Sequence, residues 1–236
     1  MAVARPLDRR SLLAGVPLFA ALNDRELDAL LTATTTKRLA AREELYHKGD
    51  PGNQLYAVMS GRLKASAAGL DGKEVVFSIM GPGEVIGEIA LLDSKPRSAT
   101  VEAMEASELL TLHRRDFLPV LERHPRVALQ LAAVLAGRLR RLSELTEDTL
   151  FLTLPSRLAK KLLSLAAEYG KPVPEGTRID VRLPQGELGE MVGTSRESIN
   201  KLLRTWTAEG IVSADRGFLT LRKRDTLDAL ANLLLV

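Results

Sequence analysis

Short apolar segments separated by glycine fill the chain from about residue 36 to residue 115. Stretches such as LYAVMSGRLKAS and EVVFSIMGPGEVIGEIALL alternate apolar and polar positions, and glycine stands at or near the breaks. Alternation with a period of two predicts half-buried strands, and glycine supplies the positive φ that tight turns need. Many short strands with regular turns predict an antiparallel roll or barrel. Leu27, Leu30 and Leu31 stand at helical spacing and predict an amphipathic helix before it.

The apolar period changes after Arg114. Pro125 suits a first helical turn, and the run VALQLAAVLAGRLRRLSELTEDTL after it predicts one long helix. Apolar residues recur there at 4-3-4-3 spacing, at Ala128, Ala132, Leu135, Leu139 and Leu142. This spacing is typical of a coiled-coil seam, so we expect the helix to pair with its copy in a homodimer. A helix packed on its own domain is the alternative that the period leaves open.

The last third of the chain predicts a winged helix-turn-helix. PSRLAKKLLSLAAEYG predicts a helix with Gly170 as its C-cap, and residues 178–183 predict one short strand. Two helical segments then meet at Gly193, followed by a strand in GFLTLRKR and a last helix near residues 227–234. We therefore expect an α+β fold in three parts. They are an antiparallel β-roll over residues 1–124, a dimerisation helix and hinge over 125–152, and a winged helix-turn-helix over 153–236.

Composition narrows the possible functions. The 236 residues are 45% hydrophobic and 27% charged, as in a soluble globular protein. No apolar run approaches the ~18–20 residues of a membrane span, so we expect a cytoplasmic protein without a membrane partner. The absence of cysteine excludes disulfides, thiolate zinc sites and cysteine-ligated clusters, and the 3 histidines lack ligand spacing, so no metal is expected. The formal charge of +3 is only mildly basic, but positive charge collects in residues 201–224.

Candidate ligand-binding residues stand in the segment 87–100. Gly87 predicts a turn, Arg97 offers a fixed fork of donors for a phosphate, and Ser98 adds a hydroxyl. Backbone N–H groups of a short helical turn at Ala90 can face the same anion, and Glu88 can accept from a sugar hydroxyl. A cyclic phosphodiester with a free 2′-hydroxyl satisfies both ends. An ordinary ion pair between Glu88 and Arg97 is the alternative.

The same segment, GEIALL followed by PRSAT, closely resembles the phosphate-binding cassette of cyclic-nucleotide-binding domains. Cassette, long helix and winged helix follow in the order found in the cyclic-AMP receptor protein (CRP/FNR) family of bacterial transcription regulators, so the resemblance covers nearly the whole chain. It implies that Glu88 holds the ribose and that Arg97 and Ser98 hold the phosphate. It also implies a complete cassette of Gly87, Glu88, Ile89, Ala90, Arg97, Ser98 and Ala99.

The resemblance also places two residues of the long helix, Leu142 and Ser143, where the family contacts the base. Ser143 matches the family pattern, whereas Leu142 departs from it, because leucine cannot hydrogen-bond a purine edge. We expect cyclic AMP as an allosteric ligand and cyclic GMP as its alternative, with no prosthetic group.

The stretch SRESINKLL predicts a recognition helix, because polar residues alternate with an apolar framework after the turn glycine. The candidate DNA-binding residues near its start are Ser195, Arg196, Glu197, Asn200 and Lys201. The stretch resembles SRETVGRIL of the cyclic-AMP receptor family. Arg196 and Glu197 match that family's base-reading pair, and Lys201 replaces a second arginine. The resemblance implies TGTGA-like half-sites in an inverted repeat; a solvated helix face is the alternative.

Together these patterns predict a cyclic-nucleotide-dependent homodimer that binds double-stranded DNA and, by resemblance, works with RNA polymerase. Ligand held against the dimer helices is expected to reorient the winged helices toward successive major grooves. The alternatives are a redox or gas sensor of the FNR type, a regulator that needs no ligand, and an enzyme. The sequence offers no nucleophile–base pair for the last of these, so we expect no enzymatic activity.

Overall fold

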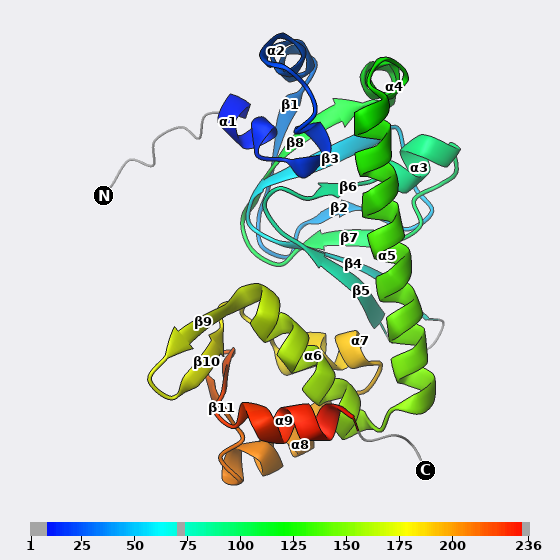
Figure 1. Cartoon of the computed structure of the whole chain (residues 1–236). Helices are drawn as coiled ribbons and strands as arrows, with labels where there is room; N and C mark the ends of the chain where they lie inside the picture. Colours follow the sequence, from blue (N-terminus) through cyan, green and yellow to red (C-terminus); the bar gives the residue numbers. More distant parts are fainter. Residues whose placement is uncertain (1–8, 70–73, 233–236) are drawn as a thin grey trace. The chain divides into compact units, whose positions relative to one another are not determined.

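A computed structural model describes residues 9–69 and 74–232, and the chain divides into two compact units (Figure 1). Of the described residues, 9–67 and 77–139 form one unit, and 68–69, 74–76 and 140–232 form the other. Both units combine helices with antiparallel strands, which confirms the predicted α+β class.

The first unit is built on two four-stranded sheets with the orders β1-β8-β3-β6 and β2-β7-β4-β5, although the end of β4 and the start of β5 fall in the second unit. Their strands are β1 (Thr35–Leu39), β2 (Glu44–Tyr46), β3 (Gln54–Ser60), β4 (Leu63–Ala68), β5 (Glu74–Met80), β6 (Val85–Ile86), β7 (Thr100–Ala103) and β8 (Ser107–His113). Neighbours such as β3 and β8 pair antiparallel. The short strands and glycine breaks therefore form the predicted β-roll.

Helices pack against this roll and contribute to one of its hydrophobic clusters. They are α1 (Arg9–Ala14), the 3-10 turn η1 (Pro17–Phe19), α2 (Asp24–Thr32), α3 (Glu88–Asp93), α4 (Arg114–Arg123) and the long α5 (Pro125–Phe151). Phe19 and Phe117 meet edge to face with their centroids 6.2 Å apart. Val127 and Leu131 of α5 are buried in the same hydrophobic cluster. The first turns of α5 are thereby anchored to the roll (Figure 1).

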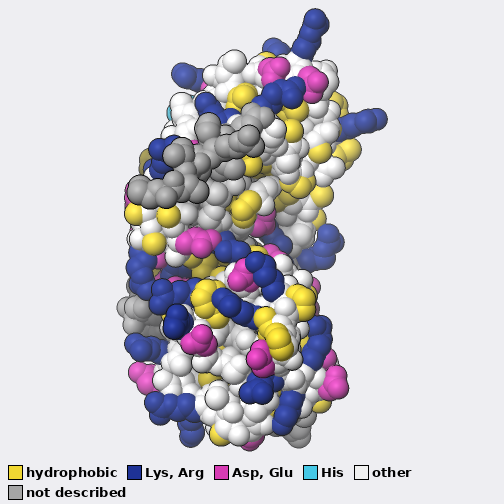
Figure 2. Space-filling view, turned by 90° about the vertical axis from the view of Figure 1, so that its left-hand side faces the viewer, with side chains coloured by type: hydrophobic (Ala, Val, Ile, Leu, Met, Phe, Trp, Pro, Cys, Tyr) yellow, Lys and Arg dark blue, Asp and Glu magenta, His cyan; other side chains and the backbone are white. Residues whose placement is uncertain are grey.

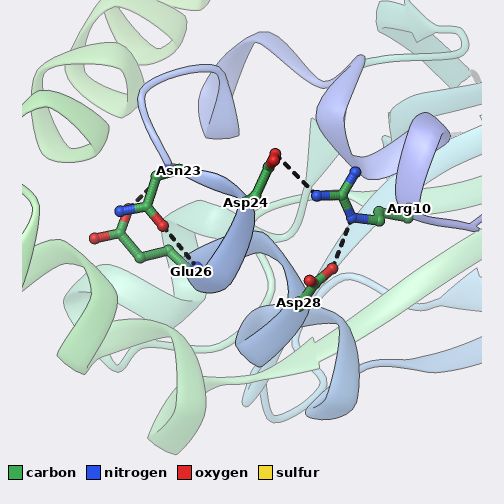
Figure 3. Close-up of polar contacts among 5 residues, drawn as sticks. All are labelled: Arg10, Asn23, Asp24, Glu26 and Asp28. Carbon is green, nitrogen blue, oxygen red and sulfur yellow. Dashed lines mark hydrogen bonds and ion pairs between the residues drawn. The ribbon is translucent and has the colours of Figure 1, made fainter.

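Helix α2 begins with a capping box (Figure 3). The Asn23 side chain accepts from the Glu26 N–H at 3.1 Å, and the Glu26 carboxylate accepts from the Asn23 N–H at 2.8 Å. These bonds satisfy two N–H groups that a helix start leaves without partners. Arg10 of α1 adds ion pairs to Asp24 at 2.8 Å and Asp28 at 2.7 Å. The helix predicted before the roll is therefore present and tied to α1.

The second unit contains the predicted helix-turn-helix and wing. Its helices are α6 (Leu154–Tyr169), α7 (Gln185–Val192), α8 (Arg196–Ala208) and α9 (Arg224–Ala231). Its sheet has the order β11-β12-β10-β9, formed by β9 (Gly170–Val173), β10 (Gly176–Ile179), β11 (Val212–Asp215) and β12 (Phe218–Leu221). In the described parts of both units, every helix is too short or too polar to cross a membrane.

Three details of this unit differ from the sequence prediction. The strand expected over residues 178–183 is instead β10, and it pairs with β9, a strand that the prediction lacked. Gly170 is the C-cap of α6, as predicted. Its backbone is extended rather than left-handed (φ −74°, ψ 136°), and the same residue begins β9. Glycine is still needed there, because a Cβ would lie 2.1 Å from the Ala166 carbonyl oxygen. The last helix ends at Ala231, and positions 233–234 lie outside the described residues.

Candidate functional site

The candidate ligand site begins where β6 ends and α3 starts. Gly87 caps α3 with φ +88°, a conformation that favours glycine. A Cβ at this position would lie 2.4 Å from Nη1 of Arg97. Glycine is therefore required twice, for its backbone conformation and for the space that the guanidinium occupies.

Arg97 lies in a slot formed mostly by backbone. Its side chain is 4% exposed, and its Nη1 and Nη2 donate to the carbonyl oxygens of Gly87 and Gln54, both at 2.9 Å. The ring of Tyr46 covers the guanidinium, with its centroid 4.1 Å from Cζ. Within the described ranges no carboxylate pairs with Arg97, so backbone dipoles and an aromatic face surround a full positive charge.

Glu88 is fully buried, with 0% exposure, and its Oε1 accepts a hydrogen bond from Arg138 of α5. Arg138 also donates to the Val85 carbonyl oxygen. The alternative of an ordinary Glu88–Arg97 ion pair is therefore wrong. Sequence reasoning missed Arg138, because nothing local to the cassette indicates a partner so far along the chain.

Two charged groups in this site keep a buried atom without a partner. Oε2 of Glu88 and Nε of Arg97 are buried and lack a hydrogen bond within the described residues. Burying such atoms unsatisfied is costly, so each one favours a bound group. Glu88 can accept a hydroxyl hydrogen and Arg97 can donate to an anion, and a cyclic nucleotide carries both groups. The residues therefore fit a cyclic nucleotide.

The remaining cassette residues surround these charges. Ala90 is buried in α3, Ile89 is 38% exposed, Ser98 is exposed and Ala99 is half-buried. Leu142 and Ser143 are exposed on α5, beyond the residue at which the first unit ends. Their contact with a base stays a prediction.

The second candidate site is the helix pair α7–α8. Gly193 ends α7 with φ +70°, and α8 begins three residues later, at Arg196. Ile199, Leu203 and Trp206 form the buried face of α8. The predicted turn and apolar framework are therefore both present.

The opposite face of α8 carries the predicted DNA-binding residues. Arg196, Glu197 and Lys201 are exposed, and Asn200 is half-buried. Ser195 has a structural part as well, because its Oγ caps α8 by accepting from the Ser198 N–H at 3.2 Å.

Sequence reasoning missed one further residue of this face, Arg204. Its spacing of four from Asn200 and three from Lys201 was the available signal.

The formal net charge of +3 is only weak evidence for a nucleic-acid-binding surface. Figure 2 shows Lys and Arg side chains spread over the face drawn, with Asp and Glu among them. The helix-turn-helix geometry therefore indicates nucleic-acid binding more strongly than net charge does.

Comparison with known proteins decides the family. Residues 36–124 match the cyclic nucleotide-binding domain model, and residues 156–230 match the Crp-like helix-turn-helix domain model. The cyclic AMP receptor protein of Thermus thermophilus is 35% identical over 218 residues, which cover 92% of this chain and 97% of the relative. The chain belongs to the CRP/FNR family of transcription regulators.

Other members of the CRP/FNR family agree. The CRP-like cAMP-activated global transcriptional regulator of Mycobacterium tuberculosis is 33% identical over 166 residues, covering 70% of this chain and 74% of the relative. The structure of the c-di-GMP responsive global regulator CLP of Xanthomonas campestris has a TM-score of 0.74 and 26% identity, covering 83% of this chain and 97% of that chain. The protein is thus a CRP-family regulator with a cyclic nucleotide-binding domain and a helix-turn-helix DNA-binding domain.

Proposed function

We propose that this regulator is a homodimer that binds TGTGA-like inverted repeats when a cyclic nucleotide, most simply cyclic AMP, occupies the cassette. One observation carries the ligand part of this proposal. Arg97 and Glu88 are both buried, do not pair with each other, and each keep a buried atom without a partner in the described residues. A ligand with an anionic phosphate and a ribose hydroxyl satisfies both.

The choice among cyclic nucleotides depends on the base. Relatives named for cyclic AMP favour that ligand, and Leu142 in place of a hydrogen-bonding residue favours weaker base discrimination. Cyclic GMP is therefore the alternative. Cyclic di-GMP requires a separate titration, because a structural neighbour is described as responsive to it.

Calorimetric titration of the full chain with each of these three nucleotides tests the ligand. We expect cyclic AMP to bind, with cyclic GMP weaker by a small factor. Binding of cyclic di-GMP alone would replace cyclic AMP as the effector. Binding of none of the three would favour a regulator that needs no cyclic nucleotide.

Arg97→Leu tests the cassette directly. Removing one partner of a buried charge pair weakens binding by about 30-fold or more. Arg38→Leu is the matched control, because it removes the same charge from an exposed position of β1 in the same unit. Unchanged affinity in the Arg97 variant would show that the phosphate is held elsewhere.

The DNA part of the proposal combines the two candidate sites. We infer three functional segments, namely a ligand domain over residues 1–124, a dimerisation helix and hinge over 125–152, and a DNA-binding domain over 153–236. Ligand bound beside α5 shifts the dimer toward the arrangement in which both α8 helices meet major grooves about 34 Å apart. Such a dimer acts in the cytoplasm and recruits or blocks RNA polymerase.

Glu197→Ala tests base reading. A carboxylate that accepts from a cytosine amino group contributes about 1–3 kcal/mol of discrimination at one base pair. We expect the variant to bind a TGTGA palindrome more weakly and to tolerate substitution at one position of each half-site, measured by gel shift with the active nucleotide. Thr207→Ala, at an exposed position near the end of α8, is the control. An unchanged sequence preference would remove Glu197 from base reading.

A further inference from the structure

An aromatic ring covers the guanidinium of the cassette arginine, Arg97. Tyr46, the last residue of β2, places its ring centroid 4.1 Å from Cζ of Arg97. Tyr56 of β3 lies farther from the same atom, at 5.6 Å, and 6.0 Å from Tyr46 between centroids. Tyr46 is therefore the main aromatic contact of the guanidinium.

Glycine backbone also lines the slot closely around Arg97. A Cβ at Gly52 would lie 3.2 Å from Nε of Arg97 and 2.3 Å from the Ala90 Cβ, and a Cβ at Gly87 would lie 2.4 Å from Nη1. Two backbone carbonyl groups fix the rotation of the guanidinium within its plane. The Tyr46 ring covers one face of the guanidinium and so limits its tilt out of that plane.

The charges around the phenol agree with this placement. Burial raises the pKa of the Tyr46 phenol, Arg97 opposes the rise and Glu88 adds to it. The phenol therefore lies close enough to both charged residues of the cassette for them to affect its pKa, and it remains protonated and neutral. The quadrupole of a neutral aromatic ring attracts a cation that lies over the face of the ring.

We propose that Tyr46 is a positioning residue of the nucleotide site, whose ring holds the Arg97 guanidinium in the plane that a phosphate requires before any ligand binds. This inference rests on the proposed function, because it needs a nucleotide to bind at Arg97. Holding the arginine in advance lowers the ordering cost of binding. The gain therefore appears in ligand affinity.

If the Tyr46 ring only fills space in the roll, different effects of mutation are expected. Tyr46 also packs against the hydrophobic cluster inside the roll. If packing were its whole contribution, its loss would lower stability and leave the affinity of the folded protein unchanged. Phenylalanine keeps the ring and removes the hydroxyl, whereas leucine removes the π-face.

The experiment compares the wild-type full chain with Tyr46→Phe, Tyr46→Leu and Tyr46→Met. Cyclic AMP, cyclic GMP and cyclic di-GMP are each titrated by calorimetry, and thermal unfolding is followed without ligand. Leu39→Ala is the control, because Leu39 belongs to the same hydrophobic cluster but lies on β1. Met provides a second non-aromatic side chain should the Leu variant fail to unfold cooperatively.

We expect Tyr46→Phe to bind within about threefold of wild type and the non-aromatic variants to bind about 5- to 30-fold more weakly. The Leu39→Ala variant should unfold at a lower temperature than wild type but bind the nucleotide with unchanged affinity. Non-aromatic variants with wild-type affinity would overturn the proposal, and so would a Phe variant as weak as Leu, because the hydroxyl would then carry the contact. A wild-type chain that binds none of the nucleotides would overturn the proposed function itself, and with it any role in nucleotide binding.

Discussion

Glu88 and Arg97 are two buried charges of opposite sign that do not neutralise each other. Arg97 donates to backbone carbonyl groups, and Glu88 pairs with Arg138 of α5. The arrangement keeps the positive end of the site available to an anion while one carboxylate oxygen already has a partner. A substitution that keeps the shape of Glu88 but removes its charge therefore measures the contribution of Glu88 to nucleotide binding separately from that of Arg97.

Glu88→Gln is expected to weaken nucleotide binding by about 10- to 100-fold, because a hydrogen bond to a charged acceptor is lost and Arg138 loses its counter-charge. Calorimetry with the nucleotide that binds wild type measures this change. Glu108→Gln, on β8, should leave affinity unchanged, because Glu108 forms an ion pair with exposed Arg38. Equal affinities for all three proteins would exclude Glu88 from the ligand contact.

The raised pKa of the Tyr46 phenol predicts a loss of stability in alkali. Well below pH 10 the phenol is neutral in both the folded and the unfolded chain, so it adds no pH dependence to stability there. Above pH 10 the unfolded chain ionises first, and stability falls by about 1.4 kcal/mol at pH 11. Urea unfolding at pH 8 and pH 11 should show a smaller fall for Tyr46→Phe than for wild type. The same fall in both proteins would contradict the prediction.

How much of the site the sequence reveals depends on distance along the chain. Glu88, Arg97 and Gly87 fall within one short segment, and a motif of that length identifies them directly. Arg138 and Tyr46 reach the same place from α5 and β2, through the pairing of strands and the packing of a helix. Neither relation leaves a local pattern, so only the three-dimensional structure adds these two residues.

At the scale of elements, most boundaries follow local chemistry. Pro125 starts α5 and Gly193 ends α7, as their residue types predict. The hairpin β9–β10 was missed because Pro172 within β9 argues against a strand. Proline is tolerated there because β9 is at the edge of its sheet. Whether residues 170–173 can form a strand therefore depends on their position at the edge of the sheet, which a single sequence does not show.

The start of α8 gives a prediction at this scale. Ser195 caps the helix, so Ser195→Ala is expected to destabilise the second unit by about 1 kcal/mol. Trp206 is the only tryptophan of the chain and is 3% exposed in α8, so its fluorescence reports unfolding of this unit. Thr207→Ala, on the same helix without a capping bond, should not be destabilised. A Ser195→Ala variant as stable as wild type would mean that the cap bond contributes nothing.

At the scale of the whole molecule, α5 is the element that the ligand site and the predicted dimer seam share. Arg138 contacts Glu88, and the next residue, Leu139, is 67% exposed although it is apolar. Leu142, one turn later, is 43% exposed. Exposed leucines at coiled-coil spacing favour a partner helix over packing within one chain. A ligand that alters the Glu88–Arg138 contact therefore acts one residue from the seam.

Leu139→Glu tests the seam and its coupling to DNA binding. A carboxylate buried without a partner between two α5 helices costs several kcal/mol, so the dimer should dissociate about 100-fold more readily or worse. Sedimentation equilibrium measures this change, and gel shift on an inverted repeat should weaken in parallel, because a monomer reaches only one half-site. Gln130→Glu adds the same carboxylate to the same helix away from the seam, and should stay dimeric. If the Leu139 variant remains dimeric, the dimer interface lies elsewhere. If it is monomeric but binds the full repeat as tightly as wild type, DNA recognition does not require dimerisation through α5.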